Sequence, residues 1–181
     1  MIFWYAIGIV LFLILTCELY TLKTGVPTVT SFPSVRKKMV EILQKEAAQH
    51  NTPSPLHILD LGSGTGKLTL EIGRAIPSAH ITGLEISLTP FLLSLLRRWL
   101  WRVTNVDYKR EDFWRYDLSG VDAVVLFING KVQERMAKKL KAELPSGALI
   151  ILNETHLPDW DPIEVLTVGL LKVKIVVYRQ T

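Results

Sequence analysis

The residues whose types and spacing could do chemistry are concentrated in one turn, DLGSGTG at positions 60–66. The apolar run before the turn predicts a strand, and the spacing of residues 67–75 predicts a helix whose N-terminus faces the turn. Gly62, Gly64 and Gly66 have no Cβ, so the backbone can adopt positive φ angles there and approach a bound ligand closely. Function is therefore expected at this turn.

The spacing of the glycines indicates which kind of nucleotide the turn binds. A dinucleotide fingerprint, G-x-G-x-x-G, would need a third glycine where the chain has Lys67, so the pattern is D-x-G-x-G-x-G instead. That pattern resembles motif I of the class I S-adenosylmethionine-dependent methyltransferases. The resemblance implies that the turn passes beneath the methionine part of the cofactor. The residues that it places at the cofactor are Asp60, Gly62, Ser63, Gly64 and Gly66. A turn without a ligand is the alternative.

Two later segments complete the expected cofactor site. Glu85 ends the second predicted strand roughly 20 residues beyond the turn, where an acidic side chain can accept both ribose hydroxyls; a solvated acid at a strand end is the alternative. Methyltransferases of this class commonly hold the adenine beyond the third strand. The resemblance therefore assigns that contact to Asp112 and Phe113, with Glu111 as the alternate residue.

Apolar periodicity predicts an alternation of strands and helices. The predicted strands are residues 56–61, 80–85, 107–110, 121–127, 148–154, 163–167 and 173–179, and the predicted helices are 35–49, 67–75, 89–101 and 131–144. Ser34 stands where an N-cap is expected for the first helix. Helical crossovers make strands parallel, and the terminal strand pair allows an antiparallel edge. The prediction is an α/β fold, Rossmann-like and seven-stranded, with its ligand at the carboxyl ends of the strands.

The N-terminus carries the most apolar stretch of the chain, from Ile2 to Leu22. It contains no Lys or Arg and has about the ~20 residues that cross a bilayer. It also lacks the basic start and small-x-small site of the alternative, a cleaved signal peptide. Basic residues follow it at Lys23 and at 36–38, so the positive-inside rule places the domain in the cytoplasm. We expect a single-pass transmembrane anchor at 1–22, an extended connector at 23–34 and a methyltransferase domain at 35–181.

Composition narrows the possible partners. The formal net charge of +4 suits an anionic membrane surface or nucleic acid without requiring either. The single cysteine, Cys17, lies in the apolar stretch, so no metal centre or disulfide framework is expected. An aromatic and basic cluster at 97–102 could stack single-stranded RNA, but helix packing or contact with a membrane surface is favoured because the predicted anchor already indicates a bilayer. Nucleic acid is therefore not an expected partner.

The order of features along nearly the whole chain resembles the ATP synthase c-subunit lysine N-methyltransferase family and its bacterial relatives. The matching segments are the apolar N-terminus, Gly25 to Pro27, the glycine turn, Glu85, Glu111 to Trp114 with Asp117 to Ser119, Lys139 to Leu144 with Gly147, and Leu157 to Trp160. The chain departs from the family at Thr65 and at Phe127 to Gly130. The resemblance implies methylation of a lysine in a membrane-associated protein.

A lysine nucleophile must be oriented and must lose its proton before it can attack a methyl group. Residues beyond the fourth and fifth predicted strands are best placed for this, and the candidates are Asn129 to orient the amine and Glu154 or His156 to accept its proton. A solvated strand-end acid and a solvated histidine are the alternatives. Two other functions remain open: methylation of a lipid or lipophilic small molecule, and a non-catalytic scaffold that binds the cofactor.

Overall fold

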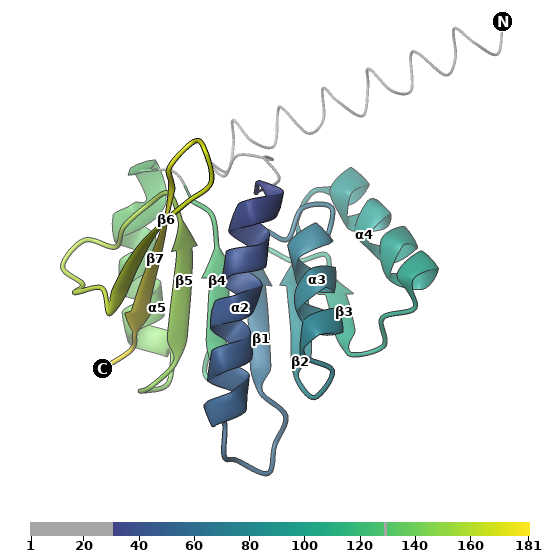
Figure 1. The fold of residues 1–181 in the computed structure, drawn as a ribbon, viewed down its shortest axis with the longest axis horizontal. Helices are drawn as coiled ribbons and strands as arrows, with labels where there is room; N and C mark the ends of the chain where they lie inside the picture. Colours follow the sequence, from purple (N-terminus) through teal and green to yellow (C-terminus); the bar gives the residue numbers. More distant parts are fainter. Residues whose placement is uncertain (1–30, 129) are drawn as a thin grey trace, which may run out of the picture.

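The structure, a computed structural model, describes residues 31–128 and 130–181 and is built on one seven-stranded sheet. The strands are β1 (His57–Leu61), β2 (His80–Leu84), β3 (Val106–Lys109), β4 (Ala123–Leu126), β5 (Leu149–Asn153), β6 (Glu164–Val168) and β7 (Val173–Arg179). Their order in the sheet is β3-β2-β1-β4-β5-β7-β6 (Figure 1). The strands β1 to β5 are parallel, while β7 runs antiparallel to β5 and to β6. The predicted seven-stranded topology with an antiparallel edge is confirmed.

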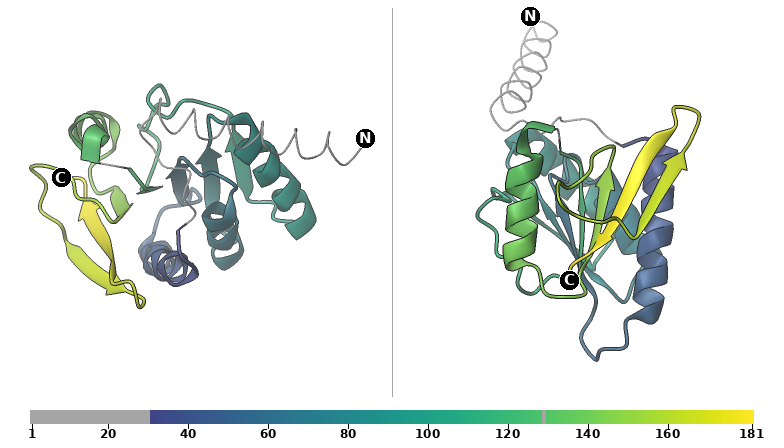
Figure 2. Two further views of the ribbon diagram at one scale, coloured as in Figure 1. Left: turned by 90° about the horizontal axis from the view of Figure 1, so that it is seen from above. Right: turned by 90° about the vertical axis from the view of Figure 1, so that its left-hand side faces the viewer.

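Helices cover both faces of the sheet. They are α2 (Pro33–Gln49), α3 (Lys67–Ala75), α4 (Leu88–Trp101) and α5 (Gln133–Glu143), the last preceded by a short 3-10 helix, η1 (Gly130–Val132). The helices α2, α3 and α4 lie over one face, and α5 lies over the other (Figure 2). The chain thus forms three layers, with the central strands buried between helices and β6 mostly exposed at one edge.

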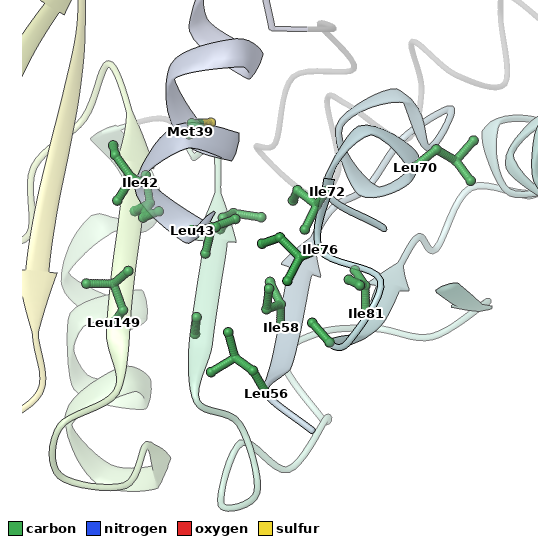
Figure 3. Packing of buried hydrophobic residues seen from close by; sticks show 14 of the residues in the cluster. Met39, Ile42, Leu43, Leu56, Ile58, Leu70, Ile72, Ile76, Ile81 and Leu149 are labelled. Carbon is green, nitrogen blue, oxygen red and sulfur yellow. The ribbon is translucent and has the colours of Figure 1, made fainter. Parts of the chain in front are cut away.

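Two clusters of buried side chains form the core, one on each face. Successive residues of β1 alternate between them: Ile58 belongs to the cluster beneath α2 and α3, and Leu59 to the cluster beneath α5. Figure 3 shows Met39 and Leu43 of α2 in the first cluster together with Ile72 of α3. The central strands are apolar on both sides because both of their faces are covered.

Long-range polar contacts fix the ends of the elements. Arg179 of β7 forms two hydrogen bonds, of 2.9 and 2.8 Å, with the carboxylate of Glu46 in α2. At the amino ends of the parallel strands, the backbone N–H of His57 donates to the Asp122 carboxylate at 2.8 Å, across 65 residues of sequence. The β1–β4 pair is therefore fixed by a side chain as well as by its ladder.

The start of the first helix differs from the prediction. The helix begins at Pro33, with Phe32 at the N-cap and no side-chain cap, so the assignment of Ser34 as N-cap is wrong. Proline suits this position because its φ is already helical and its missing N–H would have no helical partner there. The predicted anchor, residues 1–22, and residues 23–30 of the connector lie outside the described residues. Among the helices that are described, none is long and apolar enough to cross a membrane.

Candidate functional site

The glycine turn joins β1 to α3 at the carboxyl ends of the parallel strands. Gly62, Gly64 and Gly66 all have positive φ angles, of 79°, 55° and 76°. A residue with a Cβ would be strained at these angles. The backbone N–H groups of Gly62 and Ser63 donate to the carbonyl of Leu84 at 3.0 and 2.8 Å. The turn is therefore anchored to the end of β2, the strand that leads to Glu85.

Gly66 is required for a second reason, which is contact with β3. A Cβ at this position would overlap the side chain of Tyr108. The Tyr108 hydroxyl donates to the Gly66 carbonyl at 2.9 Å, and burial raises the pKa of this tyrosine, so the hydroxyl keeps its proton. Tyr108 thus supports the turn from below. The role of Tyr108 could not be predicted from the sequence, because an aromatic residue in a short strand does not indicate contact with the turn.

Asp60 lies beneath the turn and is 5% exposed. Its carboxylate accepts a hydrogen bond of 2.6 Å from the hydroxyl of Thr69, in the first turns of α3. Burial raises the pKa of Asp60 to about 7, the negative charge of Glu85 adds to the rise, and the Thr69 hydrogen bond opposes it. The side chain connects β1 to the helix that the turn opens, and its role at the cofactor through the turn stays a prediction.

Glu85 lies at the opposite side of the same turn. One carboxylate oxygen accepts a hydrogen bond of 2.9 Å from the backbone N–H of Gly64, and the other accepts one of 2.7 Å from the N–H of Ser87. Each oxygen has a second lone pair, so the carboxylate can still accept bonds from a ligand. The structure therefore brings together the glycine turn and the predicted ribose acceptor.

Two features leave room and polar partners for a ligand at the turn. A Cβ built on Gly64 meets no atom within 4 Å, so the turn is open on that side. The hydroxyl of Ser63 is buried and has no hydrogen-bond partner within the part of the chain that is described. A buried polar group without a partner is costly unless a ligand or water satisfies it.

The predicted adenine contacts lie in the loop after β3. Asp112 is half-buried, and one of its carboxylate oxygens accepts a hydrogen bond of 3.0 Å from the backbone N–H of Trp114. Phe113 is 8% exposed and belongs to the core cluster that also contains Leu61 and Leu84, the last residues of β1 and β2. Core packing leaves little of the Phe113 ring for a ligand. Both contacts stay predictions.

Two of the predicted catalytic residues, Glu154 and His156, follow β5, at the same end of the parallel strands as the glycine turn. Glu154 is exposed and has a left-handed backbone with φ of 63°, and its N–H donates to the carbonyl of Lys174 at 2.8 Å. His156 is also exposed, and Asn129 lies outside the described residues. No contact in the structure tests their roles, which stay predictions.

One arginine of the aromatic and basic cluster contacts the site. Arg97 of α4 donates to the carbonyl of Thr65, inside the glycine turn, at 2.8 Å. Sequence reasoning did not place it there, because 32 residues separate the two groups. Over residues 31–128 and 130–181, no group of three or more His, Cys, Asp or Glu side chains could hold a metal ion.

Comparison with solved structures identifies the fold. The RNA methyltransferase from Salinibacter ruber, solved in complex with S-adenosyl-L-homocysteine, has a TM-score of 0.70 and 19% sequence identity to this chain. The match covers 83% of this chain and 93% of that one. At this identity the likeness shows the fold alone, and the fold is the Rossmann-like methyltransferase fold.

Curated relatives are similar to more than half of the chain. The adenine nucleotide translocase lysine N-methyltransferase of Mus musculus is 34% identical over 126 residues, which are 66% of this chain and 52% of the relative. The ATP synthase c-subunit lysine N-methyltransferase of Rattus norvegicus is 27% identical over 108 residues, which are 58% of this chain and 48% of the relative. The chain thus spans about half the length of these relatives. The model of the ANTKMT methyltransferase domain matches residues 60–164, more than half of the chain and the whole of the glycine turn, and the chain therefore belongs to that family.

Proposed function

We propose that the chain binds S-adenosylmethionine at the glycine turn and transfers its methyl group to a lysine side chain of a membrane-associated protein. The observation that carries the proposal is the Glu85 carboxylate, held 2.9 Å from the backbone N–H of Gly64 inside a methyltransferase domain. The relatives named above, which are lysine N-methyltransferases, support lysine as the acceptor.

The residues around the turn fit the parts of the cofactor. Glu85 can accept bonds from the ribose hydroxyls, and the buried Ser63 hydroxyl can bind a polar group of the methionine part. The open side of Gly64 leaves space for close approach of the ligand. Asp112 and Phe113 are proposed at the adenine. When bound, S-adenosylmethionine supplies an electrophilic methyl group on a sulfonium centre.

The chain has little covalent chemistry to perform in such a reaction. Methyl transfer to an amine forms one C–N bond and breaks one C–S bond, so the rate depends on in-line placement of a neutral amine. The amine loses one proton in the process. We propose Glu154 or His156 as its acceptor and Asn129 as the group that orients the amine.

A membrane location is part of the proposal. The apolar stretch at 1–22 has the length and composition of a single-pass anchor, with basic residues only on its C-terminal side. We propose that this stretch anchors the chain and that the methyltransferase domain lies in the cytoplasm. An anchored domain would meet substrates that are themselves in or at the bilayer.

Methyl transfer by the full chain tests the proposal. The protein, purified in mild detergent, is incubated with tritium-labelled S-adenosylmethionine and membranes from cells that lack it. Glu85→Ala removes the proposed ribose acceptor, and Glu164→Ala removes an exposed acid of β6, at the far edge of the sheet, as the matched control. Because charged hydrogen bonds contribute about 1.5–3 kcal/mol, Glu85→Ala should weaken cofactor binding about 10-fold or more.

The chemical form of the label decides between the functions. Methyl-lysine in a membrane protein, lost in Glu85→Ala and kept in Glu164→Ala, is the expected result. Label that extracts only into organic solvent would instead identify a lipid or lipophilic small molecule as the acceptor. Cofactor binding without any transfer would contradict the enzyme and favour a scaffold.

A further inference from the structure

The helix α4 exposes an apolar surface that the fold itself does not use. Trp99 is 74% exposed, and five leucines of the same helix are 41–58% exposed. These leucines are Leu88, Leu92, Leu93, Leu96 and Leu100. Their spacing places them with Trp99 on one side of the helix, and this set is called the α4 stripe below.

The opposite side of α4 packs against the protein. Pro90 and Ser94 are buried, and the Ser94 hydroxyl donates to the carbonyl of Phe91 at 2.6 Å. Phe91 and Leu95 pack partly buried against the core cluster. Since this side already attaches the helix to the sheet, the α4 stripe contributes little to folding. A contiguous apolar surface of this kind usually marks a contact with a protein or a membrane.

Arginine provides the exposed charge at the C-terminal end of α4. Arg102 is exposed there, whereas Arg74 stacks at 4.1 Å over the ring of Trp101, which packs against the core. Arg98 lies on the packed side, where it forms an ion pair of 3.1 Å with Asp107. Leucines and a tryptophan beside arginines are typical of helices that lie in the interface of an anionic bilayer.

The proposed anchor limits how far the domain can lie from a bilayer. Residues 23–31 join the proposed anchor to Ser31 and reach at most about 30 Å when fully extended. Ser31 lies at the same end of the parallel strands as the glycine turn, since its hydroxyl accepts a hydrogen bond of 3.2 Å from Asn153 at the end of β5. The domain therefore cannot move far from the membrane, and one of its faces must lie toward it.

We infer that α4 lies in the interface of an anionic bilayer, with the α4 stripe among the upper acyl chains and Arg102 at the phosphates. The inference rests on the membrane location in the proposed function, and it adds the face of the domain that meets the lipid. Two contacts connect this helix to the candidate site: Arg97 binds the Thr65 carbonyl, and the N–H of Ser87, its N-cap, binds Glu85. The glycine turn then lies beside the lipid surface, so an acceptor lysine would be reached near the head groups.

A second exposed apolar surface lies at the β6 edge of the sheet. Leu170 and Leu171, at the tip of the β6–β7 hairpin, are 102% and 70% exposed. Together with Phe32 and Pro33 they line a hollow of about 430 Å³. This surface contains fewer exposed apolar side chains than α4, and it serves as the competing outcome in the test.

Depth-dependent quenching tests which face contacts lipid. In a Cys17→Ser background, Leu96→Cys on α4, Leu170→Cys on the hairpin and Lys138→Cys on α5 each receive an environment-sensitive fluorophore. The full chain is reconstituted into vesicles of equal parts phosphatidylcholine and phosphatidylglycerol, with or without bromine on the acyl chains. Flotation shows separately that the chain is membrane-bound, and binding of tritium-labelled S-adenosylmethionine is measured in the same samples.

The expected result is several-fold stronger quenching of the label at position 96 than of those at 138 and 170. Leu92→Ser combined with Trp99→Ser should reduce that quenching, whereas Ile163→Ser with Leu171→Ser should not.

A chain that floats while the label at 96 stays unquenched overturns the inference and leaves the anchor standing. Quenching at 170 alone assigns the contact to the hairpin, and a blue-shifted but unquenched label at 96 assigns the α4 stripe to a protein contact. Failure of flotation refutes the anchor, and absence of S-adenosylmethionine binding alone refutes the proposed cofactor site.

Discussion

Replacing Asp60 with asparagine should make the stability of the chain less dependent on pH. Burial raises the pKa of Asp60 from 3.8 to about 7, so the unfolded chain loses this proton at a lower pH than the folded chain does. Between these two values the folded state binds more protons than the unfolded state, and raising the pH therefore favours unfolding. The contribution of Asp60 to the free energy of unfolding is largest at low pH and is lost as the pH rises through the folded-state pKa.

The two pKa values determine the size of the effect. The full difference of about 3 units corresponds to about 4 kcal/mol, of which more than half falls between pH 5 and pH 8. Asparagine has no proton to lose in this range, and its amide oxygen can accept the hydrogen bond from Thr69. The free energy of unfolding of Asp60→Asn, relative to the parent, should therefore rise by about 2–3 kcal/mol from pH 5 to pH 8.

Urea denaturation of the full chain in mild detergent, repeated from pH 5 to pH 8, measures this difference. Asp161→Asn makes the same change on an exposed loop and serves as the control. Thr69→Val should steepen the pH dependence, because it removes the hydrogen bond that lowers the pKa of Asp60. Parallel pH profiles of the parent and Asp60→Asn would show that this carboxylate is not the titrating group, and the argument would fail.

Three further changes test the site and its scaffold. Gly66→Ala should lower the free energy of unfolding by about 2–4 kcal/mol, because the backbone is left-handed there and the Cβ overlaps Tyr108. Urea denaturation measures this loss. Adding Tyr108→Phe to the Gly66→Ala chain should recover part of it. Asp112→Ala should weaken S-adenosylmethionine binding in a calorimetric titration at a stability cost of about 1 kcal/mol, and an unchanged affinity removes Asp112 from the site. Arg179→Lys should cost about 1 kcal/mol in urea denaturation, because its paired bonds to Glu46 become single, and a weakened cofactor affinity would contradict a purely structural role.

Apolar periodicity was sufficient to predict the architecture. The bounds of α3 and β7 are as predicted, and every other element ends within two residues of its predicted limits. The remaining differences come from backbone geometry that composition does not reveal. For example, the strand predicted to include Glu154 ends at Asn153, because Glu154 adopts a left-handed φ of 63° that a strand cannot continue through.

The site could be predicted only where its residues belong to a linear pattern. Asp60 and Glu85 follow from their spacing around the glycine turn, and the structure places both against that turn. Tyr108 and Arg97 come from other elements, and only the three-dimensional arrangement brings them to the turn. Packing also decides which side of α4 is exposed: apolar residues surround the helix, and the side with Ser94 is the one that packs.

The hydrogen bond between His57 and Asp122 has a consequence for the order of folding. The β1–α3–β2 unit closes through a short crossover, whereas pairing β4 with β1 closes a loop of about 65 residues. Loop-closure entropy opposes this step until the ladder and the Asp122 carboxylate are in place. We therefore expect the first half of the sheet to assemble before β4 docks, with the edge of β1 unpaired until then.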